Sequence, residues 1–505
     1  MNVRELLIVL PLAVLTSLGI QYYFGGYKTT KPIEAHSEQK PLNLEIDFLD
    51  KKTSKKALVT ELDTELTRYR FSTEGASLEN IEFKRNWGGK ESYLTTIFAP
   101  SAVDKEKRCF LVALDQKTPF YFELIEKTET DDYFRLVYSA NFQDGIMEKR
   151  FIIDKKLFKI DLILTLEPKE GLQESLNPRI FYPAPIVPEL GNKDIIKGVV
   201  GDAYDRIQLL DKTEENLAKS WTKPTLFGAQ NRYFIHAFVH DKDNFVQRGY
   251  FKVFDLENLF SVLEGPEIKT KTSWQISFYV GPKEDEALVA VDTRLEQTLN
   301  YGWLGKISRP VSKILLSILK LIYDYCKNYG LAIIILTILM KLILLPFTYK
   351  SEQNMKKGIE YQKKLDYLQS KYKHDKEALR AAQAELLRKH GVPGLASCLP
   401  LLLQMPLFIA LSWVISNSIE LFMAPFLWIN DLSMPDPYYI LPILVGLAMI
   451  FHAPAADPKK RISSFAVAVL FAAFATTFSA GLGLYIFTST ALGVLQAQIT
   501  KRFVK

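Results

Sequence analysis

Cysteine is scarce in this sequence, and the common catalytic and nucleotide-binding motifs are missing. The 505 residues include three cysteines, Cys109, Cys326 and Cys398, which show neither a pairing pattern nor the spacing of a metal site. A disulfide framework and a zinc site are therefore not predicted. The chain contains no P-loop, HExxH or GxSxG motif, so ATP hydrolysis and the common hydrolase mechanisms have no support. We expect no metal, no cofactor and no enzymatic activity.

The long apolar segments carry almost no charge, with one exception. Lys341 lies near the middle of the run from Asn328 to Tyr349, which contains no other charged residue and is long and apolar enough to span a bilayer as a helix. A cation at that depth costs roughly 2.5–3.5 kcal/mol on insertion scales. The other predicted spans supply no central carboxylate to pair with it. We therefore expect the function to centre on the Lys341 ammonium. The alternative is that Lys341 only snorkels towards Tyr349, about 12 Å away along the helix.

The first part of the chain combines a membrane anchor with a large soluble region. Residues 1–25 contain a charge-free run, Leu6 to Phe24, which predicts an uncleaved anchor, with a signal peptide as the alternative. Residues 26–57 have the composition of a tether. Residues 58–295 show short alternating apolar runs broken by Gly, Pro, Asn and Asp, a pattern typical of an antiparallel β-sandwich.

Two histidines in this region, His236 and His240, superficially resemble a metal pair. They lie in a strand-like run, and strand positions four apart stand about 13 Å from each other. We therefore predict a structural role for both.

The second part of the chain is predicted to be helical and membrane-bound. Residues 300–326 combine a basic stripe and an apolar stripe at helical spacing, which favours a helix in the membrane interface with Pro310 in its first turn. Residues 327–505 are predicted to form a five-helix core. Within it, residues 350–391 are polar, rich in Lys and Arg, and typical of a helical hairpin.

The loops between the apolar segments indicate the orientation. The loop at 453–462 and the C-terminal tail are basic, whereas residues 418–437 contain acidic residues and no basic one. By the positive-inside rule, the hairpin, the 453–462 loop and the C-terminus lie in the cytoplasm. We predict six membrane spans, both termini in the cytoplasm and the β region on the outer side.

Several segments occur in an order that resembles the YidC-type membrane protein insertases: YGWLGKISRP, NYGLAIIILTILMKLILLPFTYKSEQNMKK, SCLPLLLQMPLFIALSWVISNSIELFMAPFLWINDLSMPDPYYILPIL and GLGLYIFTSTALGVLQAQI. The resemblance covers about residues 300–500, and the anchor with its β region is similar to the Gram-negative form. It implies five core helices around a hydrophilic groove that is open to the cytoplasm and the lipid and closed towards the periplasm. It also implies a sandwich similar to sugar mutarotases, without their activity. The segments VPGLASC and FSAG depart from the family pattern.

The same resemblance points to four groove residues. Lys341 occupies the position where the family usually has arginine, which keeps the charge but loses the planar fork that grips a carboxylate with two bonds. Thr337, one turn earlier, matches a polar groove position. Gln404 and Tyr485 match polar or aromatic residues of the third and last spans.

We therefore predict an insertase and chaperone of the bacterial inner membrane. It would guide hydrophobic helices and short polar tails from the cytoplasm into the bilayer through the groove that holds Lys341. The predicted partners are nascent membrane proteins, the lipid bilayer and, through the hairpin and the basic C-terminus, the Sec translocon and the ribosome. No feature predicts nucleic acid recognition.

Two other functions stay open. A secondary transporter would use Lys341 as a substrate or proton site, although the spans show no internal repeat and no second ionisable partner. A carbohydrate enzyme or binding module would lie in the β region, although no convergent acid–base pair is visible there.

Overall fold

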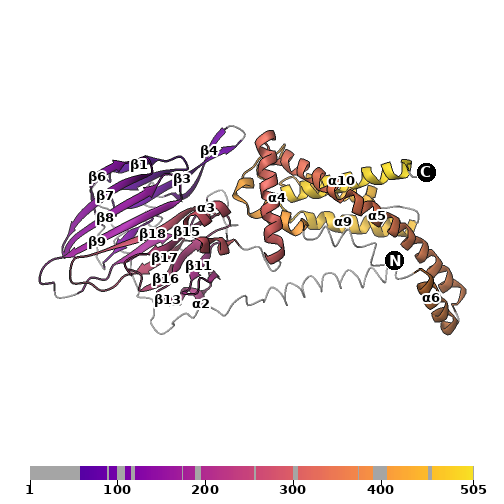
Figure 1. Cartoon of the computed structure of the whole chain (residues 1–505), viewed down its shortest axis with the longest axis horizontal. Helices are drawn as coiled ribbons and strands as arrows, with labels where there is room; N and C mark the ends of the chain where they lie inside the picture. The colour runs from indigo at the N-terminus through magenta and orange to yellow at the C-terminus, as the bar shows by residue number, and fades with distance from the viewer. Residues whose placement is uncertain are drawn as a thin grey trace. The chain divides into compact units, whose positions relative to one another are not determined.

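The computed structural model describes residues 57–87, 90–98, 108–114, 120–172, 175–187, 195–254, 258–299, 305–373, 375–390, 407–452 and 458–503. They form two compact units, a β unit before residue 300 and a helical unit after it (Figure 1). The expected fold class, a sheet-rich domain followed by a helical region, is confirmed. The predicted anchor, almost all of the tether and Gln404 lie outside the described residues.

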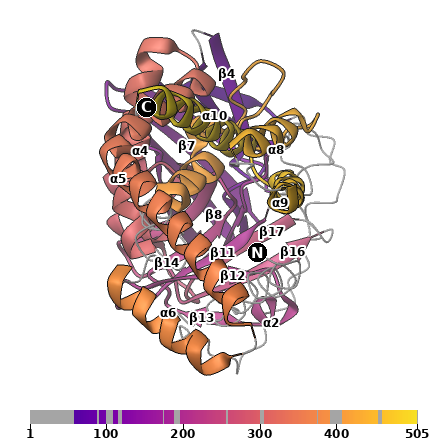
Figure 2. The ribbon, with the colours of Figure 1, turned by 90° about the vertical axis from the view of Figure 1, so that its right-hand side faces the viewer.

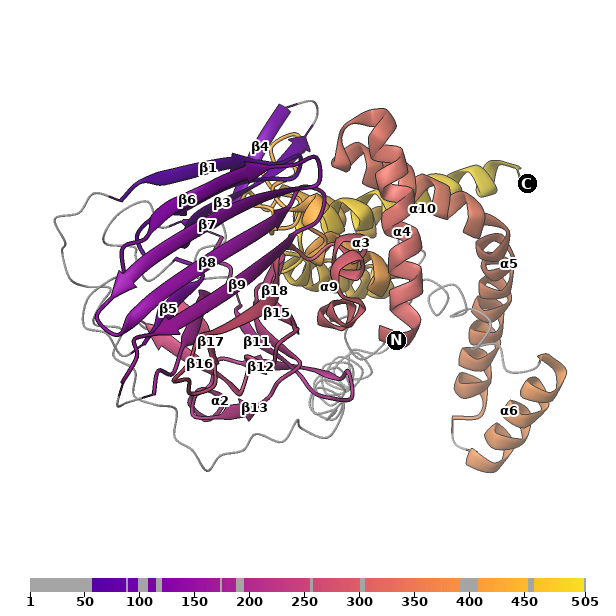
Figure 3. The same ribbon diagram turned by 60° about the vertical axis from the view of Figure 1, so that its left-hand side comes forward.

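The described part of the β unit contains three antiparallel sheets. The first runs in the order β1 (Val59–Asp63), β2 (Thr67–Ser72), β3 (Ser77–Trp87), β4 (Lys90–Phe98). The second runs β13 (Ser220–Thr222), β16 (Arg248–Phe254), β17 (Asn258–Glu264), β10 (Arg179–Pro183), β5 (Leu111–Ala113). The third runs β12 (Ile207–Asp211), β11 (Lys197–Gly201), β14 (Leu226–Gln230), β15 (Phe234–Asp241), β18 (Thr272–Pro282), β9 (Lys159–Pro168), β8 (Gly145–Asp154), β7 (Tyr133–Phe142), β6 (Glu123–Glu129). Its long strands lie side by side in Figure 3.

Alternating burial explains why these residues form packed sheets. In β8 and β9, residues such as Met147 and Leu162 are fully buried, while the residues between them are partly exposed, as expected for strands with one face on the core. Lys149 breaks this pattern, because it stands on the buried face of β8. Its ammonium donates hydrogen bonds to the backbone carbonyls of Gly75 and Phe110, each at 2.6 Å. The buried cation is therefore satisfied and holds two connecting segments against the sheet.

His236 connects all three sheets. The side chain lies fully buried on β15, and its Nδ1 donates a hydrogen bond to the Pro183 carbonyl of β10 at 2.9 Å. Its Nε2 accepts from the Thr96 hydroxyl of β4, at 3.2 Å, because the carbonyl fixes the proton on the other nitrogen. His240 is exposed, beyond a β-bulge. No group of three or more potential metal ligands occurs among the described residues.

This histidine makes the stability of the β unit depend on pH. Burial lowers the pKa of His236 from 6.5 to about 4, so the unfolded chain binds the proton more tightly than the folded one. His236 contributes its full share to the free energy of unfolding above pH 6.5. This share, about 3 kcal/mol in total, is lost as the pH falls towards 4. Denaturant unfolding of residues 57–300 between pH 4 and 8 measures this loss. His236→Gln should flatten the profile over this window and the exposed control His240→Gln should not; equal profiles for both variants would contradict the assignment.

The remaining helices include three short ones in the β unit, at α2 (Glu214–Leu217), α3 (Asp285–Val291) and η4 (Thr293–Thr298). The helical unit contains α4 (Gly305–Cys326), α5 (Tyr329–Lys371), α6 (Lys376–His390), an unlabelled helix Leu407–Asn417, η5 (Ile419–Leu421), α8 (Ile440–His452), α9 (Pro458–Ala475) and α10 (Ala480–Phe503). Within it α10 packs against α5 and α8, α9 packs against α8, and α4 packs against α5 (Figure 2).

Two details differ from the sequence prediction. The apolar segment that carries Lys341 and the first arm of the predicted hairpin form one continuous helix, α5, whose 43 residues extend about 65 Å. Pro346 does not end it. Helix α4 begins at Gly305, so Pro310 lies in its second turn rather than its first. Up to Pro346, helix α5 is apolar and packs on one face, and beyond Pro346 its residues are polar helix formers. One helix therefore continues from the apolar segment into the polar arm.

One described segment, Tyr329–Pro346, is long and apolar enough to cross a membrane by length and composition. Shorter apolar helices are Leu407–Asn417, Ile440–Phe451, Phe465–Ala475 and Ala480–Gln496. The number of spans therefore stays a prediction.

Candidate functional site

Helix α5 has a packed face and an outward face, and Lys341 lies at the boundary between them. The packed face is buried and consists of Ala332, Ile333, Leu336, Thr337 and Met340. The outward face is exposed and consists of Leu331, Ile335, Ile338, Leu339, Leu342, Ile343 and Leu345. Lys341 is half-buried, as are Ile334 and Leu344 along the same edge. Its ammonium forms no hydrogen bond or ion pair with any described residue, so no neighbour in the described part of the chain neutralises this charge.

The other predicted groove residues are placed differently. The Thr337 side chain is 1% exposed, and its hydroxyl donates to the Ile333 carbonyl at 2.6 Å. A threonine bonded to its own helix in this way bends the backbone slightly rather than offering a polar group to a ligand. Tyr485 of α10 is buried with its ring 6.4 Å from that of Phe408. Gln404 lies outside the described residues.

A compact segment, which we call the cap (residues 418–439), closes one end of the helical unit. It buries its own apolar residues, Ile419, Leu421, Phe422, Ala424, Ile429 and Leu432. The carbonyls of Leu432 and Met434 accept hydrogen bonds from the first amides of α10, Gly481 at 2.8 Å and Ala480 at 2.7 Å. The buried carboxylate of Asp436 accepts from the Trp428 indole at 3.2 Å and from the Leu441 amide at 2.7 Å. The cap is thus bound to both α8 and α10 through their first turns.

A second contact joins the cap to the start of α5. Phe426 and Ile429 exchange two backbone hydrogen bonds, of 2.8 and 2.9 Å, around a tight turn. The Phe426 ring lies directly on Gly330, where an added methyl group would overlap it. A glycine is needed here because the ring occupies the place of a side chain.

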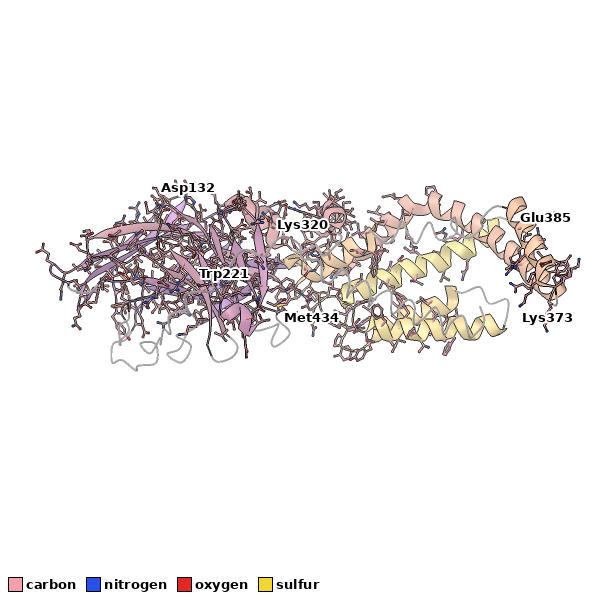
Figure 4. The ribbon with its side chains drawn as sticks, turned by 90° about the horizontal axis from the view of Figure 1, so that it is seen from below. Asp132, Trp221, Lys320, Lys373, Glu385 and Met434 are labelled. Carbon is pink, nitrogen blue, oxygen red and sulfur yellow. The ribbon has the colours of Figure 1, made fainter. Side chains whose placement is uncertain are left out.

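Helix α4 is attached to the same end by polar and apolar contacts. The buried Ser312 hydroxyl donates to the Ala410 carbonyl at 3.2 Å, and the ammonium of Lys320 pairs with the Glu420 carboxylate at 2.6 Å. The rings of Tyr323 and Tyr329 stack with centroids 4.0 Å apart across the turn to α5. In Figure 4, Lys320 and Met434 lie at one end of the helical unit and Lys373 and Glu385 at the opposite end.

The outer surfaces of α8 and α9 are apolar and exposed. Phe465 and Phe474 of α9 are 56% and 58% exposed, and Ile443 and Phe451 of α8 are 58% and 76% exposed. Soluble proteins rarely present apolar side chains so extensively, so these faces suit contact with lipid.

Family models match both units of the chain. The model described as the YidC periplasmic domain matches residues 60–314, and the model described as the 60Kd inner membrane protein matches residues 321–505. Membrane protein insertase YidC of Geobacter sulfurreducens is 29% identical over 463 residues, which cover 88% of this chain and 86% of that protein. The YidC of Helicobacter pylori is 30% identical over 413 residues, which cover 78% and 74%.

Solved structures are similar at lower identity. The crystal structure of an active YidC insertase with its first transmembrane domain resolved aligns with a TM-score of 0.37 and 16% identity, covering 98% of this chain and 99% of that one. A putative aldose 1-epimerase from Escherichia coli K12 aligns with a TM-score of 0.30 and 8% identity over 45% of this chain. The two domain matches together define an inner-membrane protein insertase with a periplasmic domain. The chain belongs to the YidC family.

The sequence prediction did not find the Lys320–Glu420 pair or the contact of Phe426 with Gly330. Lys320 was visible as part of the basic stripe of α4, and Glu420 as an acidic residue in an apolar loop. Nothing local connects two residues that are a hundred positions apart, and no periodicity reveals a ring that covers a glycine.

The contact of Gly330 with Phe426 predicts a specific loss of stability. Gly330→Ala should destabilise the helical unit by about 1–3 kcal/mol, the usual cost of overpacking, seen as a lower melting temperature in detergent. Phe426→Ala should recover part of this loss in the Gly330→Ala background, because it removes the Cγ and Cδ2 atoms that the added methyl group would overlap. Gly483→Ala is the matched control, since its methyl group would meet Leu441 at an ordinary 3.5 Å. Equal melting temperatures for both alanine variants would refute the contact.

Proposed function

We propose that this insertase moves hydrophobic helices and short polar tails into the inner membrane through a hydrophilic groove whose cation is Lys341. The observation that carries the proposal is a half-buried ammonium at the edge of the packed face of α5, with no ion pair to a described residue. A charge in that position needs water or a transient anionic partner. An acidic substrate tail supplies such a partner, and no enzymatic step is involved.

The depth of Lys341 supports this role. It lies twelve residues after Tyr329, the first residue of α5, or about 18 Å along the helix, which is near the middle of a hydrocarbon core of about 30 Å. An apolar substrate helix enters lipid spontaneously, but the polar tail that crosses first is penalised at every depth of dry hydrocarbon. A groove that carries water to Lys341 shortens the dry part of the path.

The two ends of the helical unit support the predicted orientation. Between residues 418 and 437 the sequence has acidic residues and no basic one, whereas the α5–α6 hairpin is rich in lysine and arginine. The positive-inside rule then places the hairpin and the C-terminus in the cytoplasm and the cap on the periplasmic side. The cap closes that side, so the groove opens towards the cytoplasm and the lipid.

Other residues have supporting roles in this proposal. Buried Thr337 and Tyr485 shape the wall on which Lys341 stands, and Gln404 is proposed as a polar lining residue. Nascent membrane proteins are the substrates. The exposed hairpin and the basic C-terminus form the docking region for the ribosome and the Sec translocon.

The sign of the charge at position 341 should decide activity. Lys341→Glu replaces attraction of an acidic tail by repulsion, so insertion of such a substrate should fall by at least about tenfold, and growth of an insertase-depleted strain should not be rescued. Lys341→Arg should retain both activities. Lys242→Glu, an equal charge reversal at an exposed position of the β unit, is the control. Normal insertion by Lys341→Glu would exclude the proposed role.

Hydration of the groove can be measured separately. In a chain whose native cysteines are replaced by serine, Lys341→Cys should react with a membrane-impermeant thiol reagent applied from the cytoplasmic side. Ile333→Cys on the packed face and Ile343→Cys on the outward face, where the native residues are 0% and 71% exposed, should stay unreactive because one is packed and the other faces lipid. An unreactive cysteine at position 341 would mean that no water-filled groove reaches it.

A further inference from the structure

The ion pair between Lys320 and Glu420 lies at the periplasmic end of the helical unit and has no part in the groove described so far. The two charged atoms are 2.6 Å apart; the Lys320 side chain is 42% exposed and that of Glu420 only 12%. Lys320 projects from α4, and Glu420 begins the cap immediately after the helix Leu407–Asn417. The cation is therefore accessible from solvent while its partner is held in the protein.

The pair is not needed to attach α4. The helix already buries Leu315, Leu319 and Ile322. It also donates a hydrogen bond from Ser312 to the Ala410 carbonyl and stacks Tyr323 on Tyr329. Because the Lys320 side chain is 42% exposed, water competes with Glu420 for its ammonium, and the pair adds only modestly to such packing. Its weakness suits exchange rather than anchoring.

The position of Lys320 continues the path that begins at Lys341. A tail that leaves the groove through its lipid-facing opening moves along the outward face of α5 towards its first residue, Tyr329, and Tyr329 is stacked on Tyr323, one turn beyond Lys320 on α4. The two lysines thus lie on α4 and α5, two packed helices joined by a short turn, with Lys341 in the apolar part of α5 and Lys320 near the turn.

Resting on the proposed function, we propose that Lys320 is a second binding position for acidic substrate tails, and that Glu420 occupies it between substrates. A tail carboxylate released from Lys341 displaces Glu420, pairs with Lys320 and so is retained on the periplasmic side. A lysine suits this exchange because its ammonium has three donors and holds two carboxylates at once, without a fixed two-bond grip. Glu420 returns when the tail departs.

Disulfide trapping in inverted membrane vesicles tests the exchange. The full-length insertase carries Ser317→Cys, one turn from Lys320 on the exposed side of α4, with its native cysteines replaced by serine. The probe is a ribosome-arrested single-span protein with one cysteine in an aspartate-containing N-terminal tail. Lys320→Gln should reduce the yield of adduct and Glu420→Gln should raise it, each by about threefold, the range that an exposed ion pair supplies. A probe with asparagine in place of aspartate should show no such dependence.

The control is Lys313→Gln, which removes a charge from the same basic stripe two turns away and should leave the adduct yield unchanged. Unchanged yields in both Lys320→Gln and Glu420→Gln, or equal effects on the acidic and neutral probes, overturn the proposal. Melting temperatures within the error of the parent chain exclude unfolding as a cause. Lys341→Gln separates the two hypotheses. Loss of insertion, with the residual adduct still dependent on Lys320, supports both the groove and the second binding position. Normal insertion refutes the groove, and the effect of Lys320→Gln on the adduct yield then decides the second position alone.

Discussion

The organisation of the helical unit depends on the cost of placing one cation in an apolar span. An ammonium in hydrocarbon is penalised by kilocalories per mole, and the penalty disappears only with water, a counter-ion or a route to the interface. Helix α5 provides no counter-ion for Lys341 among the described residues and sets it at the edge of the packed face. In the proposed mechanism the remaining helices leave that edge hydrated, so the bundle is packed on one side of Lys341 and open on the other.

The cap has a complementary role in the proposed mechanism, where it closes one end of the hydrated groove. The cap is tied to α8 and α10 through hydrogen bonds to their first turns, and to α5 through the ring of Phe426 on Gly330. These contacts are buried and lack the freedom to rearrange cheaply. The hairpin at the opposite end is charged and exposed, so dry packing and hydration are separated along the axis of α5.

The sequence alone was sufficient to predict the features that rest on local pattern. Alternation predicted the strands that became β8 and β9, and the apolar run around Lys341 predicted the part of α5 that is long and apolar enough to cross a membrane. The sequence alone did not predict the side-chain positions that hydrogen-bond partners determine. The hydroxyl of Thr337 turns inward to Ile333, Lys149 stands on a core face because two carbonyls satisfy it, and His236 is fixed by residues from two other sheets. The partners of Lys149 and His236 are brought in by tertiary packing, so no periodicity in the sequence reveals them. The Ile333 carbonyl is local to α5, but apolar spacing does not tell which way a threonine hydroxyl points.

The chemistry of lysine fits a protein that must release whatever it attracts. A guanidinium grips a carboxylate with two parallel hydrogen bonds, which lengthens the time the pair stays together. An ammonium is a point charge that exchanges partners by rotation. In the proposed mechanism a lysine at position 341 attracts an acidic tail and releases it rapidly, and the half-exposed ammonium at position 320 is paired with Glu420 between substrates. A polar tail that passes between weak sites needs no deep energy minimum, because its apolar helix, once in lipid, supplies the free energy that makes insertion irreversible.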